Sequence, residues 1–585
     1  MQSTMMSVPL SLNHLLERAG TIFPRSQIVS RLPDKSLRRH DFGQFHERAR
    51  RLACALAALG IGRGDRVATL CWNHHAHLEC YFGIPAAGAV MHTLNLRLAP
   101  DEIGWIAHHA AGRVLVVDDV LLPLYRQFAA HHAFEHVVVF PFGGTAPDLD
   151  ALRAQAGAPG PSGEAGEAGA PPQGWHDYEA LLARVPAEVV AGYAYPEHGE
   201  DDPVAMCYTS GTTGRPKGVA YSHRSTVLHS LVGALPDCWA LAARDVVLPV
   251  TPMFHANSWG VPYAAVMLGA KLVFPGPHLH PDDLLDLMAV EPPTMALGVP
   301  TIWLGLLGAL DANPGRWALP RGLRSLVGGS AVPESMIRRF AAHGVEIKQG
   351  WGMTETSPLA TVSCDKPELD GEDEDARFAR RALAGVPVPL VELRIVGDAG
   401  TAAWDGHSVG ELQARGPFVT GRYHAVEPEP DKFTDDGWLR TGDVAAIDEH
   451  ACVRIADRTK DLIKSGGEWI SSVDLENALM AHPAVAEAAV IAVAHPRWAE
   501  RPLACVVRRP GAAASQAELL EFLAQRFAKW QLPDAIEFVD AIPRTSTGKF
   551  WKARLREQYR DWSWRADAHD GARAAGAIGS RSQPG

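Results

Sequence analysis

The chain has 585 residues, too many for one hydrophobic core, so we expect at least two domains. A net charge of −12 argues against broad affinity for nucleic acid or anionic membranes, and no apolar stretch is long enough to predict an integral membrane segment. The eight cysteines include no CxxC pair, which favours reduced core residues in a cytoplasmic protein.

Amphipathic helical stretches alternate with short β-rich runs from residue 41 to about 140, for example at 66–70 and 113–117, and again from 245 to 326. This alternation predicts an α/β fold in which helices flank mainly parallel sheets. Residues 142–174 are rich in Gly, Ala, Pro and Glu, and we interpret them as a disordered insertion.

Between two short predicted strands, at 204–208 and 219–221, the sequence reads YTSGTTGRPKGV. Glycines at 211, 214 and 218 permit close backbone approach, so consecutive N–H groups can surround an anion. The side chains suit phosphate or Mg²⁺ as well, through one ammonium and several hydroxyls: Lys217, Thr209, Ser210, Thr212 and Thr213. A flexible linker is the alternative, but the flanking strands argue against it. The spacing is not that of the ordinary P-loop.

Further along, Gly328, Gly329 and Ser330 follow a predicted strand and leave room for a flat base or an acyl group. GWGMTE at 350–355 then places an aromatic ring, a hydroxyl and a carboxylate, which an ATP site needs, after a predicted strand. Trp351 can stack on adenine, Thr354 can bond a phosphate and Glu355 can hold Mg²⁺.

A second insertion, at 365–381, carries acidic residues from 370 to 375, which favour a solvated loop over a metal site. Asp443, after a glycine turn, can take both ribose hydroxyls, although an Asx turn would explain that motif if it stood alone.

From about residue 460 a fresh run of predicted elements begins, with helices at 472–481 and 516–527 and a strand at 485–493. We therefore divide the chain into a large domain, 1–459, and a small α+β domain, 460–585, with a frayed tail after about 565.

Six motifs in this order, YTSGTTGRPKGV, GGS, QGWGMTETSP, TGD, DRTKDLIKSGGEWIS and PRTSTGK, resemble the adenylate-forming superfamily of acyl-CoA synthetases, luciferases and peptide-synthetase adenylation domains. PMFHANSWGVPYAA and KSGGEWISSVDLENALMAHPAV are closest to bacterial medium- and long-chain fatty acyl-CoA synthetases. The resemblance implies ATP, Mg²⁺, coenzyme A and a fatty acid as ligands and suggests a homodimer. From the net charge we expect no nucleic-acid partner.

The resemblance also implies roles for individual residues. Thr209 and Glu355 would hold Mg²⁺, and residues 209–217, Gly214 and Lys217 among them, would embrace the β- and γ-phosphates. Lys549 would reach the active site from the small domain, with His255 beside the acyl carboxylate and Trp259 at the gate of the acyl tunnel. The remaining nucleotide and hinge positions would be Gly211, Gly329, Gln349, Gly350, Trp351, Thr354, Asp443, Arg458, Lys460, Lys464 and Trp469.

These roles describe an acid–thiol ligase that forms an acyl-adenylate, releases pyrophosphate and passes the acyl group to coenzyme A after a domain rotation about Lys460. Charge neutralisation is the main catalytic need, because a carboxylate must attack another anion. Four alternatives stay open: a CoA ligase for a short sulfur-containing or aryl acid, an enzyme that loads a carrier protein, a luciferase-like oxygenase and an inactive nucleotide-binding protein.

Overall fold

The computed structural model describes residues 1–562 except residue 2 and the segments 157–173, 210–214, 398, 428–430, 466–467 and 547. Contacts divide the chain into two compact units. The first comprises Met1–Thr459 together with Arg544–Lys549, and the second comprises Lys460–Pro543 and Phe550–Gly585.

The first unit contains a seven-stranded sheet in which every pair is parallel except the edge pair β8–β9. In spatial order the strands are β7 (Gly174–Asp177), β6 (His136–Phe140), β5 (Gly112–Asp118), β3 (Arg66–Leu70), β4 (Val90–Thr93), β8 (Pro203–Tyr208) and β9 (Gly218–Ser222). Their near-continuous apolar runs are buried, as expected for a sheet covered on both faces.

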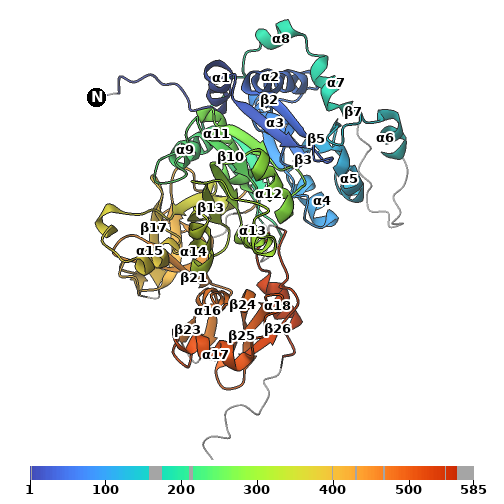
Figure 1. Ribbon diagram of the computed structural model, residues 1–585. Helices are drawn as coiled ribbons and strands as arrows, with labels where there is room; N and C mark the ends of the chain where they lie inside the picture. The colour runs from blue at the N-terminus through green and yellow to red at the C-terminus, as the bar shows by residue number, and fades with distance from the viewer. Residues whose placement is uncertain are drawn as a thin grey trace, which may run out of the picture. The chain divides into compact units, whose positions relative to one another are not determined.

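The N-terminal half contributes the following helices, of which α2 packs on both α1 and α3 (blue in Figure 1). The helices are α1 (Leu12–Ile22), α2 (Phe42–Ala58), α3 (His75–Ala86), α4 (Pro100–His109), η1 (Asp119–Leu121), α5 (Leu122–Phe128), η2 (Ala129–His131), α6 (Leu149–Ala156), α7 (Tyr178–Ala183), α8 (Ala187–Ala191) and α9 (His223–Gly233).

A nine-stranded sheet is parallel from β14 to β1 and antiparallel at both edges. Its spatial order is β16 (Val386–Pro387), β15 (Leu359–Val362), β14 (Glu346–Gly352), β13 (Arg324–Gly328), β12 (Met295–Gly298), β10 (Val246–Pro249), β11 (Lys271–Phe274), β1 (Gln27–Arg31) and β2 (Leu37–Asp41). The helices of this part of the chain are α10 (Ala256–Trp259), α11 (Val261–Leu268), α12 (Pro281–Val290), α13 (Pro300–Ala312), α14 (Glu334–Ala342), η3 (Thr354–Thr356), η4 (Pro367–Leu369) and α15 (Glu374–Arg381).

An antiparallel five-stranded sheet completes the first unit, in the order β18 (Gly400–Thr401), β17 (Glu392–Gly397), β19 (Gly410–Arg415), β20 (Leu439–Ile447) and β21 (Val453–Arg458). The second unit has its own sheet, formed by β23 (Glu468–Ile470), β22 (Ile463–Ser465), β25 (Ala499–Arg508), β24 (Val485–His495) and β26 (Ala535–Phe538), with α16 (Ser472–Met480), α17 (Gln516–Ala524) and α18 (Lys552–Gln558). The predicted fold class, a large α/β part and a small α+β part, is confirmed.

Three local predictions need correction. Part of the predicted disordered insertion at 142–174 is the helix α6, because Leu152 on that helix is buried in the core; residues 157–173 lie outside the described part. The predicted acidic loop at 365–381 keeps its acidic side chains exposed, but it forms α15, which Phe378 anchors by burial against α14. Asp443 lies inside β20 rather than after a turn.

All eight cysteines are free thiols, seven of them buried and Cys364 partly buried, as expected for reduced core residues. Across the described part of the chain, none of the helices combines the length and the apolar character that a membrane span requires.

Candidate active site

The phosphate-loop motif connects β8 to β9, which pair antiparallel with Cys207 opposite Val219 and Tyr208 opposite Gly218. The base of the loop is closed by two hydrogen bonds between Thr209 and Lys217. The Thr209 N–H donates to the Lys217 carbonyl at 2.9 Å, and the Lys217 N–H donates to Thr209 Oγ1 at 3.1 Å. The predicted phosphate-binding residues Ser210, Gly211, Thr212, Thr213 and Gly214 lie outside the described residues.

Glu355 lies on η3, directly after β14, and is only 5% exposed. Its Oε1 accepts a hydrogen bond of 2.7 Å from the Tyr423 hydroxyl, and none of the ion pairs among the described residues involves its carboxylate. A buried carboxylate without a paired cation is costly, and its hard oxygen atoms are the ligands that Mg²⁺ prefers. The residues present therefore fit the predicted magnesium site.

Tyr423 also contacts the phosphate-loop lysine, because the Lys217 ammonium lies 5.0 Å from the centre of the Tyr423 ring. Tyr221 on β9 supports the other side of the turn by donating to the Thr354 carbonyl at 2.8 Å. The structure thus joins the phosphate loop to Glu355 through two tyrosines that the sequence motifs did not single out. An isolated tyrosine gives no signal of such a role, which depends on tertiary contacts.

Asp443 holds the predicted ribose position and is almost fully buried. Its Oδ2 accepts a hydrogen bond of 2.9 Å from the Trp351 indole N–H, and its Oδ1 lies 2.5 Å from Arg458 Nε, the residue opposite it on β21. Gln349, one of the predicted nucleotide residues, accepts a 3.0 Å hydrogen bond from the Val332 N–H. The structure therefore brings Trp351, Asp443 and Arg458 into direct contact.

Lys549 belongs to the segment Arg544–Lys549, which groups with the first unit. Gly329 has a φ of +86°, which favours glycine, and it lies against the lysine stem, since a Cβ added there would be only 3.2 Å from Lys549 Cε. The pKa of Lys549 is lowered to about 8, first by burial and then by the positive charge of Arg458, while Asp443 and Glu355 oppose the shift.

His255 is part of the same neighbourhood. Burial, together with the positive charges of Lys549 and Arg97, lowers its pKa to about 3. The imidazole is therefore neutral at physiological pH and can act as a hydrogen-bond partner, but it cannot supply a positive charge to an acyl carboxylate.

The residues from Ala256 to Trp259, labelled α10, form a left-handed turn in which all four φ angles lie between 42° and 57°. Trp259 is buried, and a Cβ added at Gly328 would lie 3.6 Å from its ring. The turn is tied to the strand that carries the phosphate loop, because Cys207 Sγ donates to Asn257 Oδ1 at 3.2 Å. The predicted gate residue thus lies on strained backbone.

Three predicted residues, Lys460, Lys464 and Trp469, belong to the second unit. Lys464 and Trp469 face each other across the β22–β23 hairpin, with the ammonium 4.5 Å from the ring centre. Lys464 and Trp469 thus contact each other within the second unit. The roles predicted for all three residues toward the nucleotide stay predictions.

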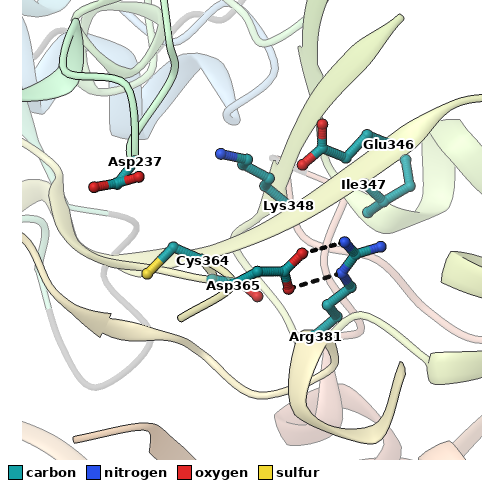
Figure 2. Close-up of a pocket in the computed structure, with 8 residues that line it drawn as sticks. Asp237, Glu346, Ile347, Lys348, Cys364, Asp365 and Arg381 are labelled. Atoms are coloured by element: carbon teal, nitrogen blue, oxygen red, sulfur yellow. Dashed lines mark hydrogen bonds and ion pairs between the residues drawn. The ribbon is translucent and has the colours of Figure 1, made fainter. Parts of the chain in front are cut away.

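A separate cavity of about 170 Å³ on the first unit is lined by charged residues on β14 and after β15 (Figure 2). Arg381 is doubly bonded to Asp365 there, and Lys348 faces the same hollow. None of the predicted site residues lines it. Lys348 lines the cavity, whereas the neighbouring residue on β14, the predicted nucleotide residue Gln349, does not. Neighbouring side chains of a strand point to opposite faces of the sheet, which is consistent with this difference.

Two family models match the chain, AMP-binding enzyme over residues 16–424 and AMP-binding enzyme C-terminal domain over residues 474–549. The chain belongs to the AMP-binding enzyme family. A long-chain-fatty-acid–CoA ligase from Thermus thermophilus is 47% identical over 96% of this chain and 97% of its own length. A 3-methylmercaptopropionyl-CoA ligase from Ruegeria pomeroyi is 42% identical over 96% of this chain and 99% of its own length.

The fold resembles the crystal structure of the anthranilate CoA ligase AuaEII in complex with anthranoyl-AMP, with a TM-score of 0.79, 24% identity and coverage of 95% of this chain and 99% of that one. The two family models and the bacterial relatives confirm the resemblance predicted from the motifs. The chain is an ATP-dependent CoA ligase of the adenylate-forming type, whereas the acid that is activated differs among these proteins.

Proposed function

We propose that the chain is a fatty acid–CoA ligase. A carboxylate oxygen of a medium- or long-chain fatty acid attacks the α-phosphorus of ATP, and the bond to the β-phosphate breaks to release pyrophosphate. The sulfur of coenzyme A then attacks the acyl carbon, and AMP leaves. The observation that carries this proposal is that Tyr423 contacts both Lys217 and Glu355, while the charges of Asp443 and Glu355 act on Lys549. Phosphoryl transfer needs such charged groups close together.

In this proposal Thr209 and Glu355 hold Mg²⁺, which when bound would neutralise phosphate charge and help pyrophosphate to leave. Lys217 and Lys549 supply positive charge to the phosphates and to the transition state. Asp443 binds the ribose hydroxyls, and the Trp351 ring stacks on adenine while its N–H orients Asp443. His255 lies beside the acyl carboxylate as a neutral partner.

We also propose that residues 1–459 form the adenylation domain and residues 460–585 a small mobile domain that rotates about Lys460 between the two half-reactions. Contacts change from the first unit to the second between Thr459 and Lys460, which supports a hinge there. The loop from Ser465 to Glu468 would then serve the pantetheine arm. From the sequence alone we further propose a homodimeric, cytoplasmic protein.

A second candidate substrate is a short sulfur-containing acid. It is favoured by one observation, the 42% identity to a 3-methylmercaptopropionyl-CoA ligase over nearly the full length of both chains. The fatty-acid proposal is preferred because the identity to the long-chain ligase is higher, at 47%.

The experiment that tests the proposed function separates the two half-reactions. The chain, ATP and Mg²⁺ are mixed with a fatty acid without coenzyme A, and enzyme-bound acyl-adenylate and pyrophosphate are quantified. We expect about one equivalent of each per active site, and acyl-CoA with AMP once coenzyme A is added. Formation of ADP and phosphate, or no pyrophosphate with any acid, would contradict the proposal.

A further inference from the structure

The segment Phe418–His424 is bonded to both walls of the candidate ATP site. The His424 N–H donates to the Gly218 carbonyl at 2.8 Å, which ties the segment to the end of the phosphate loop. On the other wall, the Thr420 N–H donates to the Glu355 carbonyl at 2.7 Å. The segment therefore spans from the phosphate loop to the Glu355 turn by backbone bonds alone.

Tyr423 lies within this segment, is 5% exposed, and its side chain contacts a residue of each wall. Its hydroxyl donates to Glu355 Oε1 at 2.7 Å, and its ring faces the Lys217 ammonium at 5.0 Å. Phe433 packs on the ring, with centroids 5.8 Å apart, and so restricts its orientation.

We infer that Tyr423 is a positioning residue for the metal and the phosphates: its hydroxyl fixes the Glu355 carboxylate, and its ring fixes the Lys217 ammonium. This inference rests on the proposed function, in which Glu355 holds Mg²⁺ and Lys217 binds phosphate.

A neutral hydroxyl suits this role better than a cation would. It uses one lone pair of Oε1 and orients the carboxylate, but it leaves the negative charge of Glu355 available to a metal ion. An arginine in the same place would orient the carboxylate and neutralise it. The ring acts in a similar way on Lys217, because a cation–π contact holds the ammonium without supplying a competing anion.

The test uses two variants that separate the hydroxyl from the ring. ATP binding is titrated calorimetrically without fatty acid, so that no turnover occurs, at a series of Mg²⁺ concentrations and with no metal. For Tyr423→Phe we expect the Mg²⁺ concentration at half-maximal enhancement of ATP binding to rise about tenfold, as for other partners of metal ligands, with unchanged metal-free ATP affinity. For Tyr423→Leu we expect metal-free ATP binding to weaken as well, because the Lys217 ammonium loses the aromatic ring at 5.0 Å that helps to orient it.

The chain offers a matched control in Tyr178. Its hydroxyl donates to Glu79 Oε2 at 2.7 Å and Arg48 lies 6.0 Å from its ring, but none of these residues belongs to the candidate site. Tyr178→Phe should lower the melting temperature without shifting the Mg²⁺ titration. An equal shift in Tyr178→Phe and Tyr423→Phe would overturn the inference, because it would reflect a general loss of stability.

Glu355→Gln distinguishes failure of the inference from failure of the proposed function. If Glu355→Gln raises the Mg²⁺ requirement while Tyr423→Phe does not, the positioning role of Tyr423 is overturned and the metal assignment stands. If Glu355→Gln leaves the Mg²⁺ titration unchanged, Glu355 is not the metal ligand. The metal assignment and the positioning role of Tyr423 are then both overturned.

Discussion

Among single residues, Lys549 has the most specific predicted effect. Its ammonium is near Glu355 and Asp443, where charge on the phosphates would be neutralised, and the proposed domain rotation would remove it before the second half-reaction. We expect Lys549→Ala to slow adenylation by about 10²-fold or more, the usual loss for a transition-state charge donor, and to spare thioester formation from supplied acyl-adenylate. Equal losses in both half-reactions, measured by rapid quench, would contradict the assignment.

The pKa of Lys549 also predicts a pH dependence. With a pKa of about 8, raising the pH through 8 removes the proton and its positive charge, so the charged fraction falls from about 90% at pH 7 to about 10% at pH 9. We expect kcat/KM for ATP in adenylation to fall with this profile. In Lys549→Arg, the always-charged guanidinium should abolish the decline between pH 7 and 9. An unchanged decline in that variant would assign it to another group.

The residues proposed to bind the nucleotide could be proposed from the sequence where the side chain itself carries a charge that suits phosphate, Mg²⁺ or ribose. Lys217, Glu355 and Asp443 carry charges close to glycines, and the occurrence of six motifs in order, rather than any one of them, indicates an ATP site. The role of Tyr423 was not predictable, because its partners Lys217 and Glu355 are distant in sequence and only the fold brings them together.

At the scale of elements, the strands are read more easily from the sequence than the turn at α10. The run at 66–70 was predicted with the bounds of β3, because apolar residues buried on both sheet faces leave a plain pattern. Ala256, Asn257 and Ser258 carry no pattern that distinguishes a left-handed turn from a right-handed helix. Tertiary hydrogen bonds hold this turn, including that from Ser258 Oγ to the Thr251 carbonyl at 2.9 Å.

The left-handed turn predicts that substitution by glycine changes the free energy of unfolding in opposite directions at Ala256 and at Ala264, which lies in the following helix. Ala256 has a φ of 42°, where glycine is less strained, so Ala256→Gly should raise the free energy of unfolding by roughly 0.5–1 kcal/mol after the greater freedom of the unfolded chain is subtracted. Ala264, in the right-handed helix α11, is fully buried, and Ala264→Gly should lower the free energy of unfolding by about 1 kcal/mol or more. Urea unfolding measures both, and destabilisation by Ala256→Gly would argue against the left-handed turn.

At the scale of the whole molecule, the two units predict separable half-reactions. Lys460→Pro fixes φ at the proposed hinge and should hinder rotation. We expect pyrophosphate release in a single turnover to persist, and transfer to coenzyme A to slow by at least about tenfold, so that acyl-adenylate accumulates. Lys460→Ala, which keeps the backbone free, is the control. Normal thioester formation in Lys460→Pro would place the hinge elsewhere.

The central claim is that this ATP-dependent CoA ligase acts on fatty acids, and substrate preference tests it most directly. The measurement is kcat/KM for acyl-CoA formation across straight-chain acids from C2 to C18, 3-methylmercaptopropionate and aryl acids, with pyrophosphate release followed in parallel. We predict the highest values for medium- or long-chain fatty acids, because each buried methylene contributes about 0.8 kcal/mol of binding. Turnover confined to aryl acids or to 3-methylmercaptopropionate would contradict the claim.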